Sequence, residues 1–174
     1  MEPITLVILG KKSSIRRELQ AAGWYLSDKI SIKTAAKSLW VSIADKSYRQ
    51  GPMWPSFISG RPNDMGFEMP TQSDTYRRRH HLRIWKTRYF LKRQRVWVGT
   101  LSYDSGVGFI KHSFIPAHHI SPSLELESQY LTRTLHILKP VSARLSKPES
   151  GKINTGDSYI WNGRALILDF SNET

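Results

Sequence analysis

The sequence contains no cysteine, and this absence excludes disulfide bonds, thiolate nucleophiles and cysteine metal ligands. No stretch approaches 18 apolar residues, so we expect no membrane-spanning helix. The Gly-x-Ser-x-Gly motif of serine hydrolases and the glycine spacing of phosphate-binding nucleotide loops are also missing. The apolar run near the start is too short, and lacks the basic flank, for a secretory signal. We therefore expect a cytoplasmic protein, with peripheral attachment to a membrane as one option.

Acidic residues are absent from 76 to 95, and this segment holds nine of the 26 basic residues. The chain carries a formal net charge of +12, yet outside this segment 17 basic residues face 14 acidic ones. An isolated positive patch attracts phosphates, nucleic acid or an anionic membrane surface. We therefore predict an anion-binding face formed by Arg77, Arg78, Arg79, Arg83, Lys86, Arg88, Lys92, Arg93 and Arg95. The structural alternative is a solvated hairpin that protects a sheet edge.

A length of 174 residues with 39% hydrophobic residues fits one domain with a sizeable core. Apolar residues at helical spacing predict three main helices, over about 13–22, 31–45 and 122–139. Apolar runs and alternating patterns predict strands over 4–9, 56–59 and 65–69, and an antiparallel meander over 81–90, 96–103 and 107–115. A charged turn is expected between the first two strands of the meander.

The pair Asn162-Gly163 between two apolar runs predicts a C-terminal hairpin over 157–170. Asp104-Ser105-Gly106 likewise predicts a tight turn between two strands of the meander. The predicted fold is α+β: a largely antiparallel twisted sheet with three main helices packed on it. It is a single domain over 1–174, with its core in 3–138.

Two pairs of neighbouring histidines, at 80–81 and at 118–119, raise the question of a metal site. Zinc or iron could use His112 with His118 or His119 and the carboxylate of Asp104. Acids are scarce near these histidines, however, and neighbours on a strand point to opposite faces. We therefore predict no metal site and no cofactor.

A second hypothesis is a phosphoester hydrolase. A histidine would shuttle protons while an arginine holds phosphate in a shared cleft. The residues proposed for these roles are His81, Arg83, Asp104 and His119. The alternative for His81 and His119 is a structural hydrogen bond to a buried carboxylate or backbone group.

The turn Gly10-Lys11-Lys12-Ser13-Ser14 joins a predicted strand to a predicted helix. Phosphates bind at such a position because backbone N–H groups and the helix dipole point toward them. We prefer the interpretation as an ordinary polar turn, with an anion site as the alternative, since the spacing matches no nucleotide-binding motif.

Several short motifs in a fixed order resemble the LssY C-terminal domain family. The resemblance spans about residues 3–138. It rests on Pro3-Ile4-Thr5-Leu6-Val7, Ala21-Ala22-Gly23-Trp24, Gly60-Arg61 with Asp64 and Phe67, Arg79-His80-His81-Leu82-Arg83-Ile84-Trp85, Val96-Trp97-Val98-Gly99, Asp104-Ser105-Gly106-Val107 and His118-His119-Ile120.

The resemblance implies a domain that occurs alone or fused to membrane modules, including those of the phosphatidic-acid phosphatase type. It implies no particular reaction. Where the family tends to carry acids and an arginine after His119-Ile120, this chain has Ser121, Ser123 and Ser128. That departure and the basic segment favour binding over catalysis. We therefore expect a non-catalytic domain that docks onto lipid headgroups, an acidic protein surface or nucleic acid. A protein partner in a membrane-linked assembly is one such possibility.

Overall fold

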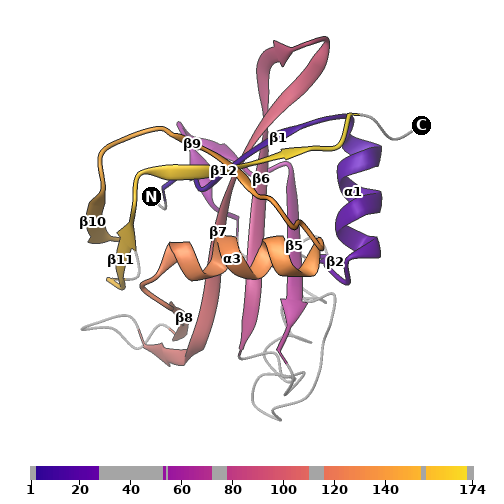
Figure 1. Ribbon diagram of the computed structural model, residues 1–174. Coiled ribbons are helices and arrows are strands. Elements are labelled where there is room, and N and C mark those ends of the chain that lie inside the picture. The colour runs from indigo at the N-terminus through magenta and orange to yellow at the C-terminus, as the bar shows by residue number, and fades with distance from the viewer. Residues whose placement is uncertain are drawn as a thin grey trace.

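A computed structural model describes residues 3–27, 53, 55–71, 78–109, 116–153 and 156–171, with the backbone alone at 105–109 and 116–118. The described part is mostly strand and contains two helices, α1 (Lys12–Ala21) and α3 (Leu124–Thr134). The helix expected over 31–45 lies outside the described residues. The prediction of three main helices packed on a sheet is wrong, because strands rather than helices dominate the described chain (Figure 1).

Eight strands form the main sheet, in the order β2-β5-β6-β7-β1-β12-β9, with β8 paired to β7. Two small two-stranded sheets, β3-β4 and β10-β11, complete the described strands. The strands are β1 (Leu6–Leu9), β2 (Tyr25–Leu26), β3 (Phe57–Ile58), β4 (Arg61–Pro62), β5 (Met65–Pro70), β6 (Arg79–Leu91), β7 (Gln94–Phe109), β8 (Pro116–Ile120), β9 (Val141–Arg144), β10 (Glu149–Lys152), β11 (Ser158–Trp161) and β12 (Arg164–Asp169).

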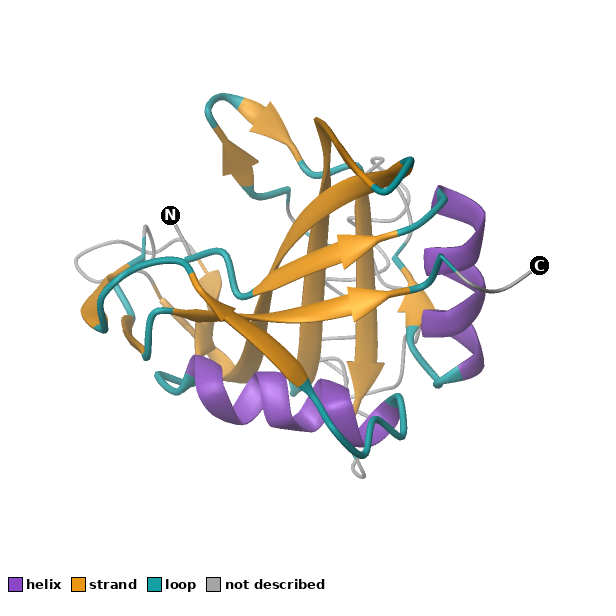
Figure 2. Ribbon diagram, turned by 45° about the horizontal axis from the view of Figure 1, so that its top comes forward, coloured by secondary structure: helices purple, strands orange, loops and turns teal. Residues whose placement is uncertain are grey.

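The main sheet is mixed, because β1 and β12 run parallel side by side (Figure 2). The predicted hairpin over 157–170 is wrong: β11 pairs with β10, whereas β12 pairs with β1 and β9. A turn does form, since Gly163 has a φ of 78° and the side chain of Asn162 accepts a hydrogen bond from the backbone N–H of Arg164. The apolar strand β12 instead pairs with the N-terminal strand, a contact between distant segments that a local motif cannot indicate.

The β6–β7 hairpin is the longest part of the sheet. The predicted charged turn between its strands is confirmed at Lys92-Arg93. The predicted turn at Asp104-Ser105-Gly106 is wrong, because β7 continues through it with a register shift between Asp104 and Gly106. A β-bulge absorbs the extra residue without ending the strand.

The hydrophobic core lies on one face of this sheet, where Phe67, Leu82 and Leu101 stand in register on β5, β6 and β7. Helix α3 crosses in front of these three strands and α1 stands beside them (Figure 1). Leu19 of α1 and Leu131 of α3 join the same cluster. Both helices predicted in these regions are confirmed, but α3 ends at Thr134 and the later part of the expected helix, 135–139, is not helical.

Candidate functional site

Strand β6 presents different chemistry on its two faces, because alternate residues point in opposite directions. His80 faces the core side: its Nδ1 lies 2.6 Å from Oε2 of Glu127 on α3, and its ring stacks on Tyr130 at 3.6 Å between centroids. His81 faces the other side, where its cross-strand neighbours are Glu68 and Ser102. The expectation that neighbouring histidines serve opposite faces is therefore met at this pair.

The face opposite the core holds a buried cluster of charged side chains, which we call the charge cluster. Nη1 of Arg79 donates to Oε2 of Glu68 at 2.6 Å, and both residues are almost fully buried. Nε2 of His81 lies 2.7 Å from Oδ2 of Asp104, and its Nδ1 lies 3.8 Å from Oε1 of Glu68. Next along β6, Nη1 of Arg83 donates to the hydroxyl of Ser102 at 3.3 Å, on the same face. The cluster is formed by Glu68, Arg79, His81, Arg83, Ser102 and Asp104.

The imidazole of His81 lies between two carboxylates in this cluster. Burial lowers its pKa, but the charge and hydrogen bond of Asp104 and the charge of Glu68 outweigh burial, so the pKa of His81 is raised above 6.5. Arg83 opposes that rise. Burial also raises the pKa of the Glu68 carboxyl, against the opposing charges of His81 and Arg79. The cluster can therefore hold a proton on His81, as an acid–base group would.

The four residues of the hydrolase hypothesis are placed as follows. His81 and Asp104 are in direct contact, and Arg83 lies on the same face of the sheet. Nδ1 of His119 contacts Oδ1 of Asp157 at 2.7 Å, and that carboxylate also accepts from the backbone N–H of Ile120. The structure therefore pairs each of the two histidines with a carboxylate. His81 contacts Asp104, which belongs to the proposed set, whereas His119 contacts Asp157, which does not.

The metal hypothesis gains no support from the described residues. No group of three or more histidine or acidic side chains in the described part of the chain is arranged to hold a metal ion. His112 lies outside the described residues, and for His118 only the backbone is described.

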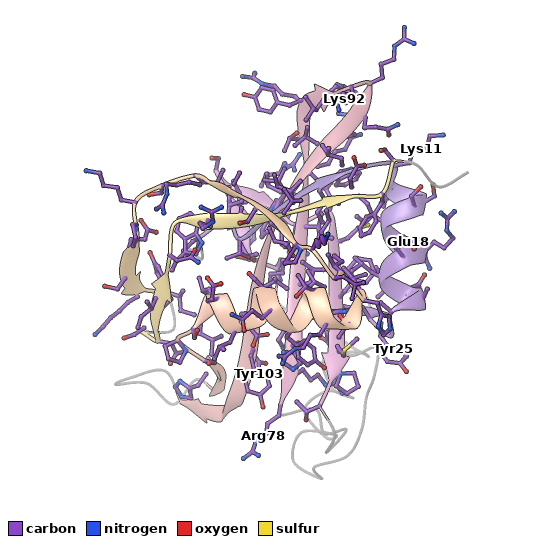
Figure 3. The ribbon with its side chains drawn as sticks, viewed as in Figure 1. Lys11, Glu18, Tyr25, Arg78, Lys92 and Tyr103 are labelled. Atoms are coloured by element: carbon purple, nitrogen blue, oxygen red, sulfur yellow. The ribbon has the colours of Figure 1, made fainter. Side chains whose placement is uncertain are left out.

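The nine basic residues of the predicted anion-binding face do not share one surface. Arg77 lies outside the described residues, Arg78 is exposed at the opposite end of the hairpin from Lys92, and Arg79 is 0% exposed (Figure 3). Arg79 therefore leaves the predicted face, because Glu68 binds it inside the protein. Arg83 lies on the face of the charge cluster. The remaining five belong to the outer half of the hairpin, residues 86–95, here called the outer hairpin: Lys86, Arg88, Lys92, Arg93 and Arg95.

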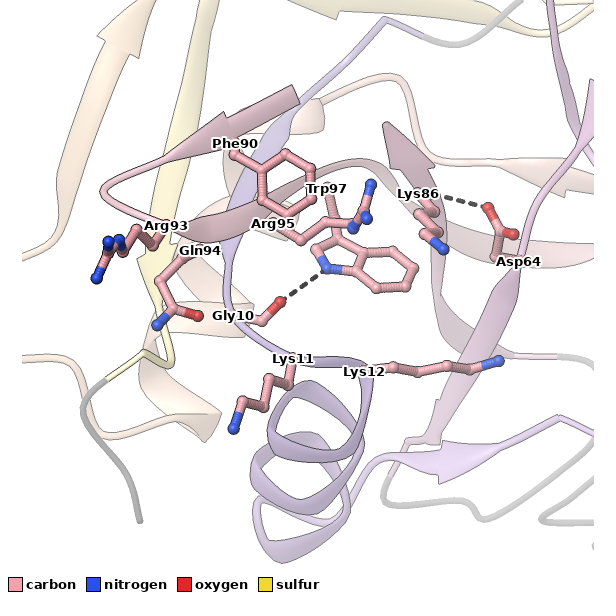
Figure 4. A pocket seen from close by; sticks show the side chains of 10 residues that line it. All are labelled: Gly10, Lys11, Lys12, Asp64, Lys86, Phe90, Arg93, Gln94, Arg95 and Trp97. Atoms are coloured by element: carbon pink, nitrogen blue, oxygen red, sulfur yellow. Dashed lines mark hydrogen bonds between the residues drawn. The ribbon is translucent and has the colours of Figure 1, made fainter. Parts of the chain in front are cut away.

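A cleft of about 470 Å³ opens between the outer hairpin and the start of α1, and we call it the basic cleft (Figure 4). Asp64 is the one acid among its described lining residues, and the guanidinium of Arg61 contacts that carboxylate at 2.9 Å. Phe90, Gln94, Trp97 and Gly10 line it as well. Five cations surround it: Lys11, Lys12, Lys86, Arg93 and Arg95.

The start of α1 adds to the positive potential of the basic cleft. The helix has no acidic residue in its first turn, and the side chain of its N-cap residue, Lys11, makes no capping hydrogen bond. Two lysines at the positive end of a helix dipole destabilise the helix, since that end favours negative charge. The lysines of the 10–14 turn, where the sequence left an anion site open as an alternative, therefore lie beside the outer half of the predicted basic face.

Gly10 holds these two parts together. Its N–H donates to the carbonyl of Arg95 at 3.1 Å, and its carbonyl accepts from the indole N–H of Trp97 at 3.0 Å. Its φ is 142°, and an added Cβ would lie 3.2 Å from the carbonyl oxygen of Phe170. Gly10 thereby fixes the position of α1 beside β7.

Gly10→Ala is expected to lower the free energy of unfolding by about 1–3 kcal/mol, because only glycine adopts this φ without strain. Urea denaturation followed by circular dichroism measures the change. Gly156→Ala is a matched control for the backbone term alone: its φ is 92°, but no atom lies within 4 Å of the added Cβ. An equal loss in both variants would show that the contact with Phe170 contributes nothing.

The structure thus defines a mostly β domain with a mixed sheet, a buried charge cluster on one face and a basic cleft at one end. The family model described as "LssY C-terminus" matches residues 1–165, and the chain belongs to this family. No curated protein and no solved structure matches the chain. Within the part of the chain that the structure describes, neither helix is long and apolar enough to cross a bilayer.

Sequence reasoning did not identify Glu68 or Asp157 as partners of the histidines. Glu68 has a local signal, since it is the one charged residue within the apolar strand β5. A single carboxylate in an apolar strand indicates a buried partner. Asp157 has no such signal, because it stands in a polar segment and meets His119 only through the fold.

Proposed function

We propose that this domain is a non-catalytic binding module that docks onto an anionic partner through the basic cleft. The observation that carries the proposal is the convergence of five cations on one cleft from two distant segments, the start of α1 and the outer hairpin. Each contributes long-range attraction to phosphate or carboxylate groups. Lipid headgroups, acidic protein surfaces and nucleic acid all supply such groups.

Among the residues that the structure describes, no carboxylate forms an ion pair with any of the five cations around the basic cleft, and this supports binding. Asp64 contacts Arg61, so it offsets a cation outside the set of five. By contrast, the arginine that the protein uses structurally, Arg79, is buried against its own carboxylate. Arg79 therefore stabilises the folded protein, whereas the five cations of the basic cleft are available to bind a partner.

Binding to a single-stranded oligonucleotide and to anionic vesicles tests the proposal. If about five cations contact a polyanion, a fourfold rise in salt weakens binding about 100-fold. Lys11→Gln/Lys12→Gln/Arg93→Gln is expected to weaken binding at low salt about 100-fold, at about 1 kcal/mol for each charge near the surface. Fluorescence anisotropy and vesicle sedimentation measure these changes.

The matched control removes three exposed charges elsewhere: Lys139→Gln/Arg144→Gln/Lys147→Gln. It has the same net charge as the cleft variant and is expected to bind nearly as the unmodified protein does. No binding to either polyanion at low salt, or equal weakening in both variants, would contradict the proposal.

A second candidate function, hydrolysis of a phosphoester, is favoured by the 2.7 Å contact between His81 and Asp104 beside Arg83. In this reading His81 carries the proton and Arg83 holds phosphate. Turnover of p-nitrophenyl phosphate that Asp104→Asn abolishes would support it. The absence of turnover across pH 5–9, with a range of divalent cations present, would remove it.

A further inference from the structure

The tip of the outer hairpin exposes three consecutive large apolar residues. Tyr89, Phe90 and Leu91 are 60%, 58% and 53% exposed. Three adjacent exposed apolar residues are unfavourable in water unless a partner covers them. Neighbouring residues on the same turn are cationic, so one short structure combines apolar side chains with positive charge.

This tip projects away from the rest of the sheet (Figures 1 and 3). The pairing of β5 with β6 ends at Ile84, and the pairing of β1 with β7 ends at Val96. Beyond these points lie residues 85–91 of β6 and residues 94–95 of β7, which pair with each other. The backbone bond from Gly10 to Arg95 anchors the base of this projection on the β7 side.

The projecting tip is braced internally, so its shape does not depend on a partner. Nη1 of Arg95 donates to the carbonyl of Thr87 at 2.9 Å, and its guanidinium lies 4.1 Å from the centre of the Phe90 ring. The hydroxyl of Thr87 donates to the carbonyl of Val96 at 2.6 Å and accepts from the N–H of Tyr89. The apolar side chains are thus presented on a formed hairpin.

The turn at the apex carries backbone strain. Lys92 and Arg93 have φ values of 47° and 65°, as in the type I′ turn that favours Asn-Gly. Non-glycine residues in this region cost stability. Two long cations therefore occupy positions where smaller residues would make the hairpin more stable, which points to a binding role for their charges.

We infer that the outer hairpin inserts shallowly into the interface of an anionic phospholipid bilayer. This rests on the proposed function, and it names the partner of the basic cleft. Tyr89, Phe90 and Leu91 enter the region between headgroups and acyl chains, to a depth of about 5–10 Å. Lys92 and Arg93 extend their charged ends to lipid phosphates, and the cations of the basic cleft lie over the same anionic surface.

The chemistry of the tip favours lipid over nucleic acid. A two-stranded ribbon fits the major groove of DNA, but there it needs hydrogen-bonding side chains toward the base edges. This ribbon offers the aliphatic Leu91 and two aromatic rings at its end, with Gln94 as the one uncharged polar side chain at the turn. Apolar side chains with a cationic border match a bilayer interface, which is apolar beneath anionic headgroups.

Sedimentation with vesicles of phosphatidylglycerol in phosphatidylcholine tests the inference. The variant Tyr89→Ser/Phe90→Ser/Leu91→Ser keeps every charge and is expected to lose about 10- to 100-fold in vesicle binding. Its binding to a double-stranded oligonucleotide, whose paired bases do not stack on exposed rings, is expected to stay within about twofold, because the cations remain. Leu138→Ser/Val141→Ser/Ile160→Ser removes three apolar residues elsewhere that are each at least as exposed as the tip residues and serves as the matched control.

Lys92→Asn/Arg93→Gly separates binding from folding. It relieves the backbone strain, so we expect the melting temperature to rise by about 2–4 °C. Vesicle binding is expected to weaken at the same time, because two cations are lost. A rise in melting temperature with unchanged vesicle binding would show that Lys92 and Arg93 do not contact the bilayer.

Site-specific labelling gives a direct readout, because the chain has no natural cysteine. A fluorophore at Leu91→Cys is expected to move to an apolar environment on adding anionic vesicles, whereas one at Leu138→Cys stays in water. Vesicle binding with the Leu91→Cys label still in water would overturn insertion but leave the proposed function standing. Equal losses of vesicle and oligonucleotide binding in the tip variant would assign the tip to polyanions in general. No binding to any polyanion would overturn both proposals.

Discussion

Arg79→Ala is expected to lower the free energy of unfolding by about 3–5 kcal/mol. The guanidinium of Arg79 is 0% exposed and lies 2.6 Å from the carboxylate of Glu68, which is itself 1% exposed. Removing one member of a buried ion pair leaves the other charge without compensation in a medium that solvates it poorly. Urea denaturation at neutral pH measures the loss.

The neighbouring residue is the matched control for Arg79→Ala. Arg78→Ala removes the same side chain from an exposed position one residue earlier and is expected to change stability by less than about 0.5 kcal/mol. Adding Glu68→Gln to Arg79→Ala is expected to recover part of the loss, because the stranded charge disappears. Similar small effects of Arg78→Ala and Arg79→Ala would show that the buried ion pair of Arg79 with Glu68 does not contribute to stability.

The free energy of unfolding is expected to fall as pH rises above 6.5, because His81 then loses the proton that stabilises the folded state. The pKa of His81 is raised by Asp104 and Glu68 despite its burial, so the folded state binds the proton more tightly than the unfolded state. The stabilisation is complete below pH 6.5 and is lost as pH rises through the folded-state pKa. Between these two values the free energy of unfolding falls by up to about 1.4 kcal/mol per pH unit.

Unfolding measured by urea at several pH values tests this expectation. His81→Gln removes the titrating group, so we expect the fall above pH 6.5 to flatten, whatever the variant's overall stability. His136→Asn removes an exposed histidine, whose φ of 53° suits asparagine, and is expected to keep the fall. A pH profile that His81→Gln leaves unchanged would show that the charge cluster holds no proton on His81.

These expectations concern the face of β6 that carries the charge cluster. The segment 76–95 reads as a uniform run of positive charge, yet Arg79 is buried against Glu68 whereas Arg88, Lys92 and Arg93 are exposed. Arg79 and Arg78 differ by one position and by nearly complete burial. Arg79 is the first residue of β6 and pairs with Pro70 of β5, whereas Arg78 lies just before the strand, so only the pairing with β5 decides which of the two is covered.

Local patterns in the sequence predicted the strand at 4–9, the helix start after Gly10 and the turn at Lys92-Arg93. Each depends on residues near in sequence, where apolar spacing and glycine act directly. Local patterns failed at Asn162-Gly163, because β12 pairs with β1 rather than β11. They failed again at Asp104-Ser105-Gly106, where β7 continues as a bulged strand.

The sequence by itself determined the charge, the absence of thiol chemistry, the family resemblance and the two separate groups of cations at 10–14 and 77–95. Only the tertiary structure joined the first group to the outer half of the second, divided the basic residues between interior and surface, and paired His81 with Asp104 and Glu68. The physical reason is that charge and turn preference are properties of single residues and their neighbours. Burial and ion pairing depend on which distant strands the hydrophobic core brings together.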